Sequence, residues 1–410
     1  MLAEIMKDDE AVADEVEAFF RDFDHRSEFF QTHFLNIAKA ASQKAPALRS
    51  PRYGGFNVVS SFNLMQRVSQ PADFPSSGWT QSVPRSLMPD LIPANYNPPE
   101  HGFYRSALNP LFSPSRIAKL QQEVEDLAAS LVSKAIDAGG AELVRDIAMP
   151  LTGRTSLGLF GFEPEDWRKY NDPIHNATYA IGTEEDRRAE QQQYGENIAN
   201  TVAELIKDPN PDTVVGALCT FEKDGRRISQ EEINKTINNL IIGGLGTTQA
   251  AISTSTVYLA RNPDRRQELI DSPELIPAAV NEFIRVFSPT PFSGREVARD
   301  IEIGGHLFRA GEPVLMFRSA ANWDPDFVER PYEIDFRRKS SRMASLGVGM
   351  HMCLGQHLAR LEFSAALRAL LKLAPNFELG EKGPKLPPNF GAGVAFIEVP
   401  LKFNQSRVAG

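Results

Sequence analysis

Cys353 is the residue with the clearest capacity for chemistry, because it stands in a glycine-rich segment directly before a helical run. Residues 346–355 read LGVGMHMCLG, and the run covers residues 356–373. Glycines permit positive φ angles and let the backbone approach something flat or bulky. A helix N-terminus lowers a cysteine pKa and favours the thiolate. The pattern therefore predicts a thiolate that acts as a nucleophile or as a metal ligand, and not the small buried apolar residue that a single cysteine usually is.

A long helix with glycines at its centre is the second candidate. Ser229 and Glu232 form a capping box and Asn262-Pro263 is a stop signal, which predicts a helix of about 32 residues, or about 48 Å. Its middle, residues 240–248, reads LIIGGLGTT, and each glycine there costs roughly 1 kcal/mol relative to alanine. One explanation is a flat ligand pressed against the backbone, with a threonine hydroxyl free to bond a small polar guest. The other is close helix–helix packing, with the threonines bonded to the preceding turn.

The third candidate is the pair Glu282 and Arg285, which lies in an otherwise apolar helical segment. The i,i+3 spacing puts both charges on one face of the helix. Such ExxR pairs are very common on protein surfaces. This pair therefore gains meaning only from the rest of the chain.

Taken in chain order, the glycine–threonine helix, the ExxR pair and the GxGxHxCxG segment resemble the cytochrome P450 family of haem-thiolate monooxygenases. The resemblance covers nearly the whole chain. Residues 54–77 are similar to the family's first strand–helix region, residues 98–105 (PPEHGFYR) to the start of the helix that contacts the haem, and residues 321–325 (ANWDP) to the turn written ANRDP. Within the family, the sequences of these motifs are most similar to those of the soluble bacterial class, in particular camphor hydroxylase.

The pattern of apolar residues indicates the fold class. Apolar residues recur at three and four positions through residues 100–285, whereas residues 297–305, 307–317 and 394–403 are short and strand-like. This predicts an α+β chain, mainly α, with small sheets built from distant segments. No change in composition marks a linker, so residues 1–410 are expected to form a single domain. The resemblance implies the triangular P450 fold, with the long central helix over the haem.

The resemblance also implies how haem b would be held. Cys353 would be the axial thiolate and the metal ligand, and a thiolate favours O–O cleavage over oxygen carriage. Two histidines and two arginines would donate hydrogen bonds to the propionates, which need such partners if they are buried. The residues expected to bind the cofactor are His101, Arg105, Arg295, Gly347, His351, Cys353 and Gly355.

Proton delivery is expected to depend on Thr247, which would be the distal hydroxyl that serves bound dioxygen. The family usually has Asp or Glu directly before this threonine, whereas this chain has Gly246. The carboxyl group that would pass protons to the distal threonine is therefore missing. Water, Thr247 or Thr248 would have to carry the protons instead.

Four other positions complete the comparison with the family. Glu282 and Arg285 would be structural, as a buried charge pair on the cysteine side. A third polar partner of that pair is often an arginine where Glu333 stands, so no third partner is assigned. Leu346 replaces the aromatic residue that usually begins the cysteine segment, which changes the packing beside the thiolate.

These features predict a monooxygenase that inserts one oxygen atom from dioxygen into a small apolar organic substrate, with terpenoids and aromatic compounds favoured. Pro89 stands where camphor hydroxylase offers a hydroxyl to its ketone, so camphor itself is not favoured. The expected substrate wall consists of Met88, Leu91, Ile92, Leu245 and Phe292.

No flavin or nicotinamide fingerprint is present, so the electrons are expected from an iron–sulfur ferredoxin and its reductase. Such a partner is acidic and needs a basic docking surface. Basic residues occur in segments expected on the Cys353 side, although an ordinary mixture of surface charges would look the same. They are Arg105, Arg116, Lys119, Arg338, Lys339, Arg342 and Arg360.

Gly246 leaves a second enzymatic hypothesis open, namely a haem-thiolate enzyme that uses peroxide or rearranges its substrate without oxygenation. A haem-dependent sensor or carrier is a third, although no signalling segment is attached. A zinc site at His351, Cys353 and His357 lacks a second Cys/His pair to complete a tetrahedral set. A dinucleotide site is excluded because residues 347–352 (GVGMHM) lack the third glycine and a βαβ context.

Composition narrows the class of protein further. The 44 Lys and Arg against 53 Asp and Glu give a net charge of −9, which argues against a nucleic-acid partner. Two cysteines, Cys219 and Cys353, make no disulfide framework and fit a reducing compartment. The acidic N-terminus lacks signal-peptide features, and no stretch of about 18 apolar residues could cross a membrane. We expect a cytoplasmic monomer.

Overall fold

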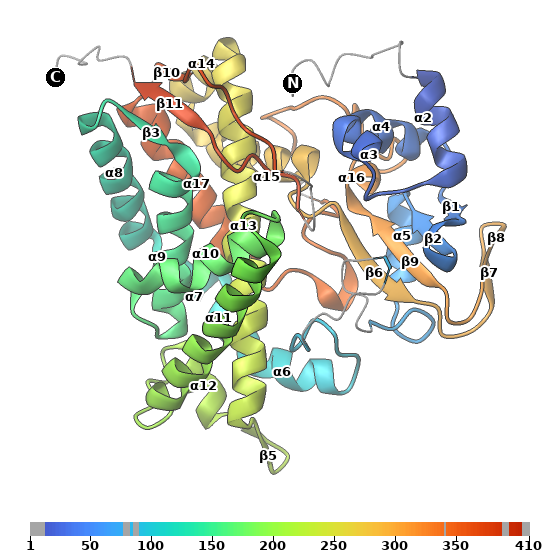
Figure 1. Cartoon of the computed structure of the whole chain (residues 1–410), viewed down its shortest axis with the longest axis horizontal. Helices are drawn as coiled ribbons and strands as arrows, with labels where there is room; N and C mark the ends of the chain where they lie inside the picture. The colour runs from blue at the N-terminus through green and yellow to red at the C-terminus, as the bar shows by residue number, and fades with distance from the viewer. Residues whose placement is uncertain (1–12, 77–82, 85–89, 340–341, 388–392, 404–410) are drawn as a thin grey trace.

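The computed structural model describes residues 13–76, 83–84, 90–339, 342–387 and 393–403. A bundle of helices forms one part of the molecule, and a part with a sheet and the N-terminal helices lies beside it (Figure 1). The helices are α2 Ala13–Phe19, α3 Glu28–Thr32, α4 Phe34–Gln43, α5 Phe62–Val68, α6 Glu100–Leu108, α7 Pro114–Ala118, α8 Gln121–Asp137, α9 Met149–Phe160, α10 Trp167–Thr178, α11 Glu184–Leu205, α12 Val214–Thr220, α13 Gln230–Arg261, α14 Pro263–Asp271, α15 Ile276–Phe287, α16 Arg318–Ala321 and α17 Gln356–Leu373. The fold is therefore α+β and mainly α, as the sequence predicts.

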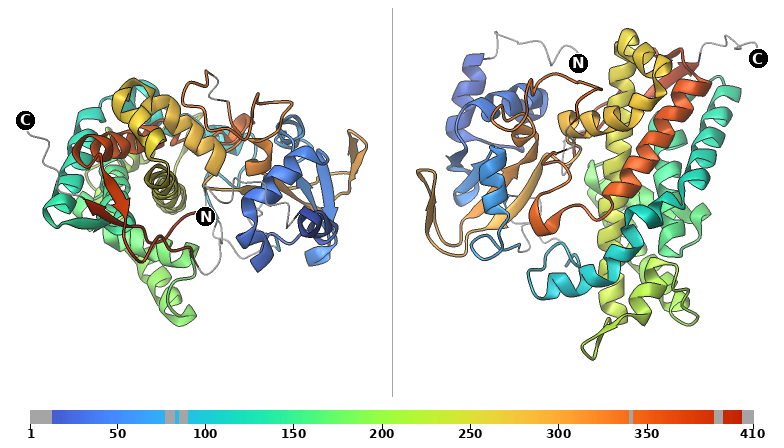
Figure 2. Two further views of the ribbon diagram at one scale, coloured as in Figure 1. Left: turned by 90° about the horizontal axis from the view of Figure 1, so that it is seen from above. Right: turned by 180° about the vertical axis from the view of Figure 1, so that it is seen from behind.

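The long helix α13 runs through the bundle and is surrounded by other helices (Figure 2). It has 32 residues, begins at the capping box formed by Ser229 and Glu232, and ends at Asn262. These are the limits that the local signals predict. Helices α9, α10, α11 and α17 contact it, and residues 248–259 are buried throughout.

The described chain contains four small sheets, of which two join segments that are distant in sequence. The largest has the strand order β1-β2-β9-β6, in which β2 and β9 are parallel and the other pairs are antiparallel. The others have the order β10-β11-β3 and the hairpins β4-β5 and β7-β8. The strands are β1 Ala47–Ser50, β2 Phe56–Val59, β3 Gly140–Glu142, β4 Glu222–Lys223, β5 Arg226–Arg227, β6 Phe292–Glu296, β7 Ile301–Ile303, β8 His306–Phe308, β9 Pro313–Phe317, β10 Phe377–Leu379 and β11 Pro400–Phe403.

Each of the three stretches predicted to be strand-like does contain a strand, but the limits of the strands differ from the prediction. Of the stretch predicted over residues 297–305, only β7 is a strand. The stretch over residues 307–317 divides into β8 and β9, and of residues 394–403 only the end forms β11. Turns cause the first two differences, because Gly304, Gly305 and Gly311 have positive φ angles between the strands. The described parts of residues 69–99 contain no helix or strand.

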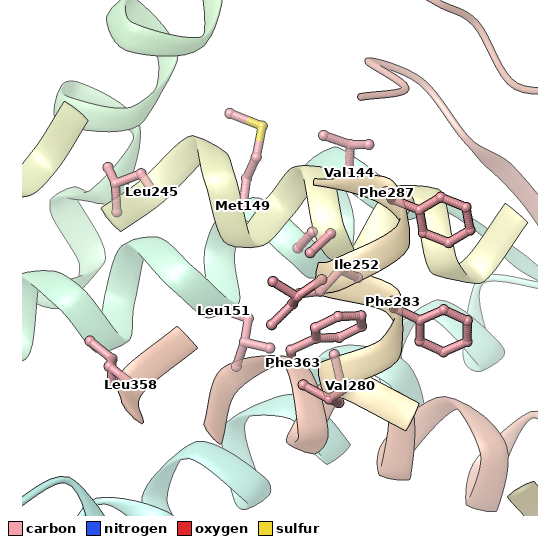
Figure 3. Packing of buried hydrophobic residues seen from close by; sticks show 14 of the residues in the cluster. Val144, Met149, Leu151, Leu245, Ile252, Val280, Phe283, Phe287, Leu358 and Phe363 are labelled. Carbon is pink, nitrogen blue, oxygen red and sulfur yellow. The ribbon is translucent and has the colours of Figure 1, made fainter. Parts of the chain in front are cut away.

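One cluster of buried apolar side chains extends through both parts of the molecule, from Val16 to Phe403. Figure 3 shows its centre, where α9, α13, α15 and α17 meet around Leu151, Ile252, Phe283 and Phe363. Since α15 carries the ExxR pair and α17 follows Cys353, this packing fixes both elements against the long helix.

Candidate active site

The cysteine segment folds as a tight loop ahead of α17. The backbone amide of Cys353 donates a hydrogen bond to the carbonyl oxygen of Leu346 at 2.7 Å. Gly347 has a φ of +78°, and a Cβ at this position would lie 3.0 Å from the carbonyl oxygen of His351. Gly355 is the N-cap of α17. The glycine at position 347 is therefore required by the turn that presents the sulfur.

The environment of Cys353 favours a metal ligand over a free nucleophile. Burial raises the pKa of the Cys353 thiol, and this effect exceeds the lowering by the Gly355 amide, which hydrogen-bonds to it, and by Arg318 and Arg105. The helix N-terminus does lower this pKa, as predicted, through the amide of Gly355, but the loss of solvent, which the sequence could not show, outweighs it and the net shift is upward. A bound metal cation would deprotonate the coordinating thiol outright. A free nucleophile at this place would have no such cation to stabilise its thiolate.

Cys353 lines a cavity of about 180 Å³ together with all four side chains predicted to hold propionates. The rings of His101 and His351 are 4.5 Å apart, and Nη1 of Arg105 donates a hydrogen bond to the carbonyl oxygen of Met352 at 3.2 Å. Arg295 reaches the cavity from β6. Segments that are distant in sequence thus meet around one space, as the resemblance implies.

This cavity holds positive charge without a matching anion among the described residues. Arg295 is 6% exposed, and within the described residues its side chain donates only to the carbonyl oxygen of its neighbour Gly294, at 2.7 Å. Nε2 of His351 is buried without a hydrogen-bond partner. Burial lowers the pKa of Arg295 to about 10 and, with Arg295 and other nearby cations, that of His351 to about 3. Two buried carboxylates such as haem propionates would supply the missing charge and acceptors.

Sequence reasoning missed Arg318, a further cation of this cavity. It follows β9 directly and lines the cavity, and its guanidinium has no hydrogen bond or ion pair within the described parts of the chain. Burial lowers its pKa to about 10. A charged residue at the end of the buried run VLMF (residues 314–317) is the signal that could have found it, because such a charge needs a partner.

The glycines of α13 border a second cavity, of about 120 Å³, together with Thr247 and Ala250. A Cβ added at Gly243 or Gly246 would meet nothing within 4 Å. Close helix packing therefore does not explain these two glycines, and the open space favours a ligand against the backbone. The hydroxyl of Thr247 donates to the carbonyl oxygen of Gly243 at 2.9 Å, so the predicted bond to the preceding turn is present as well.

Thr248 points to a different neighbour, the carboxyl group of Glu362 on α17. Glu362 is 1% exposed, shares a hydrogen bond with Thr248 and has Oε1 without a partner. Burial raises the pKa of Glu362 well above its ordinary value, because the charged carboxylate would lose its solvation there. The sequence gives little sign of this group, since a glutamate in a helix is usually exposed.

Glu282 and Arg285 form a buried ion pair, with Nε of Arg285 2.8 Å from Oε1 of Glu282, which confirms the structural expectation. Arg285 also donates to the carbonyl oxygens of residues 322, 331 and 333. Nε of Arg338 lies 2.9 Å from Oε1 of Glu282. Arg338 is therefore the third partner that the sequence could not assign, because it lies five residues beyond the expected position.

Of the five residues expected to form the substrate wall, Leu91 lines the second cavity. Leu245 is fully buried in the core, because two residues beyond Gly243 the helix has turned by about 200°. Ile92 is 1% exposed and Phe292 packs against Phe317, and neither lines a described cavity. None of these three residues lines either of the two cavities, and their part in the substrate wall stays a prediction; Met88 lies outside the described residues.

The described residues also bear on two further questions, whether the chain has a zinc site and whether one of its helices could span a membrane. Within it, no group of three or more His, Cys, Asp or Glu side chains is arranged to hold a metal ion, so the zinc alternative gains no support. None of its helices is both long and apolar enough to span a bilayer.

Known proteins resemble this chain in sequence and in fold. The family model described as Cytochrome P450 matches residues 159–404. Cytochrome P450 105A3 of Streptomyces carbophilus is 30% identical over 310 residues, which cover 75% of each chain. The vitamin D3 dihydroxylase of Streptomyces griseolus is 31% identical, over 69% of this chain and 70% of that protein. The solved structure of a mutant of P450 EryK in complex with erythromycin B is 26% identical, with a TM-score of 0.82, over 93% of this chain and 98% of that one.

The half-buried thiol, the cations without an anionic partner among the described residues and the open face of the long helix thus occur together in a fold shared with haem proteins. The chain belongs to the cytochrome P450 family. It is accordingly a cytochrome P450 monooxygenase with haem b as its cofactor.

Proposed function

We propose that this enzyme inserts one oxygen atom from dioxygen into a small, mainly apolar organic molecule, with terpenoids and aromatic compounds favoured. The observation that carries the proposal is the arrangement of the two cavities. One contains Cys353 and the unpaired cations, and the other contains Thr247, and Asn239 of α13 lines both. A cofactor in the first cavity would therefore adjoin a substrate in the second.

In this proposal Cys353 binds the iron, and Gly347 and Gly355 shape the loop that presents the sulfur. The propionates are bound by His101, Arg105, Arg295, Arg318 and His351. A thiolate-ligated haem supplies electron density that favours O–O bond cleavage. Arg295 is buried and Arg105 and Arg318 are half-buried, so their hydrogen bonds to the propionates would be strong and would orient the cofactor.

Protons are handled by Thr247, Thr248 and Glu362. Thr247 lines the second cavity, and Glu362, whose pKa burial raises well above its ordinary value, shares a hydrogen bond with Thr248 at the next position of the helix. Gly246 provides no acid, so the transfer from Glu362 to the cavity depends on Thr248 and water. We expect this longer route to be slower than one through an adjacent carboxylate.

The Gly246→Asp variant tests this account of proton delivery. Its carboxyl group fits, because a Cβ at Gly246 meets nothing within 4 Å. General acid assistance is typically worth about 10²–10⁴-fold, so turnover with dioxygen should rise by about tenfold or more while turnover with peroxide changes little. The measurement is product formed per electron consumed, with and without added peroxide.

Gly246→Asn is the matched control, since it adds the same volume without an acid, and Thr247→Ala should increase peroxide release. A native enzyme that is already fast and tightly coupled with dioxygen would contradict the account. If the native enzyme works only with peroxide, or only rearranges its substrate, the alternative haem-thiolate function replaces the dioxygen-dependent one.

Electrons are proposed to come from an iron–sulfur ferredoxin and its reductase. The expected basic surface is smaller than the sequence suggests, because Arg338 is paired with Glu282 and Arg360 is bonded to Asn281. Lys119 and Lys339 are exposed. These two lysines are the side chains of the predicted set best suited to a direct test.

Reduction by an acidic ferredoxin should slow as salt rises, because screening weakens attraction between exposed charges. We expect Lys119→Glu combined with Lys339→Glu to lower the association rate by about tenfold at low salt. Arg188→Glu, at an exposed position of α11, is the control. A rate that is indifferent to both salt and charge reversal would contradict a basic docking surface.

The same proposal covers the organisation of the protein. The continuous core supports a single domain over residues 1–410. The two free cysteines support a reducing compartment such as the cytoplasm. The net charge of −9 supports small-molecule and protein partners over nucleic acid. We propose that the enzyme acts as a monomer.

A further inference from the structure

Tyr179 differs from the other tyrosines of this protein in the state of its hydroxyl group. The chain has eight tyrosines, and seven of them share a hydrogen bond with a side chain; these are Tyr53, Tyr96, Tyr104, Tyr170, Tyr194, Tyr258 and Tyr332. The hydroxyl of Tyr179 has no such partner anywhere in the described residues, although the residue is only 4% exposed. Tyr179 lines a cavity, and a polar group in the wall of a largely buried, mainly apolar cavity normally pairs with water or a ligand.

The surroundings of Tyr179 place it in the second cavity. It lines the same space of about 120 Å³ as Thr247 and Ala250 of α13. Its ring packs in a small apolar cluster with Ala250, Ala395 and Ile397. A Cβ at Gly393 would lie 3.4 Å from the Tyr179 hydroxyl oxygen, so the bare backbone of this glycine keeps space beside the hydroxyl open.

The chemistry of this group is that of a donor in apolar surroundings. Burial is the only influence on its pKa and raises it, so the phenol remains protonated and able to donate. The atom that it suits is a neutral acceptor oxygen, since the groups packed around it supply no charge to hold an anion.

We propose that the Tyr179 hydroxyl donates a hydrogen bond to a carbonyl oxygen of the substrate, so that this enzyme selects compact apolar ketones over hydrocarbons of the same shape. This inference rests on the proposed function, because it names the substrate class of the same cavity. A substrate without such an oxygen would leave the hydroxyl buried and unpaired, and sites of this kind discriminate strongly against the analogue that lacks the acceptor.

The test compares two probes of nearly equal shape, 2-adamantanone and 2-methyleneadamantane, on the haem-loaded enzyme. Dissociation constants are measured by calorimetry, which does not depend on turnover. We expect the native enzyme to bind the ketone about tenfold more tightly, and Tyr179→Phe to remove this preference by weakening the ketone alone. The infrared carbonyl band of the bound ketone should lie at lower wavenumber in the native enzyme than in the variant.

Tyr194→Phe is the matched control, because that hydroxyl is equally buried but donates to Oδ1 of Asn238 at 2.8 Å. It should keep the preference for the ketone. The proposal is overturned if Tyr179→Phe retains the preference and the carbonyl band, or if the native enzyme binds neither probe. The spectrum of the reduced carbon monoxide adduct reports separately on the haem-thiolate function, so a failure of that function is recognised independently.

Discussion

The Cys353→Ser variant should lose the absorption band that thiolate ligation gives to the reduced carbon monoxide adduct, and with it nearly all monooxygenase activity. Cys353 is the sole cysteine that lines the cavity holding the unpaired cations. Serine is a poor donor to haem iron, and a thiolate is what favours O–O cleavage. The band of Cys353→His should move to the shorter wavelength of imidazole-ligated haem proteins.

Cys219→Ser provides the matched control for this experiment. Cys219 lies at the end of α12 and lines neither cavity, so its removal should leave the spectrum unchanged. An unchanged band in Cys353→Ser, or its loss in Cys219→Ser, would show that the assignment of the iron ligand is wrong. The cations of the cavity should still bind haem in the serine variant, which separates loss of the ligand from loss of the cofactor.

Glu282→Gln should be the most destabilising single substitution among those considered. It leaves Arg285, which is 1% exposed, and the neighbouring Arg338 without their carboxylate. Removing one partner of a buried ion pair typically costs about 3–5 kcal/mol, because the remaining charge stays buried. The free energy of unfolding from denaturant titration measures the effect.

Haem retention should fall together with stability in this variant. The side-chain amide of Asn322 donates to the carbonyl oxygen of Arg285 and its oxygen accepts from the backbone of Ala344, while the hydroxyl of Ser345 donates to Ile284. Through these bonds α15 holds the base of the loop that leads to Cys353. Loosening α15 should therefore loosen the iron ligand as well.

The matched control is Glu333→Gln, which breaks an exposed i,i+3 pair with Arg330. Both side chains of that pair are more than half exposed, so its loss should cost at most about 1 kcal/mol. Similar losses for Glu282→Gln and Glu333→Gln would mean that burial of the ExxR pair has no energetic consequence.

Features that depend on neighbouring residues could be predicted from the sequence alone. The limits of α13 follow from a capping box and an Asn-Pro stop, and the cysteine loop follows from Gly347 and the residues around it. The fold class followed from the spacing of apolar residues, and the family from the order of its segments. Such signals act within one or two turns of chain, so they can be interpreted before the tertiary structure is known.

Only the tertiary structure decided which polar groups are buried and which face of a helix meets a cavity. Arg318, Arg338 and Glu362 look like ordinary charged residues in the sequence, and Leu245 looks like a wall of the substrate site. The direction of the Cys353 pKa likewise reversed once burial was known. The physical reason is that desolvation and charge pairing depend on side chains brought from distant elements, and no local spacing encodes their positions.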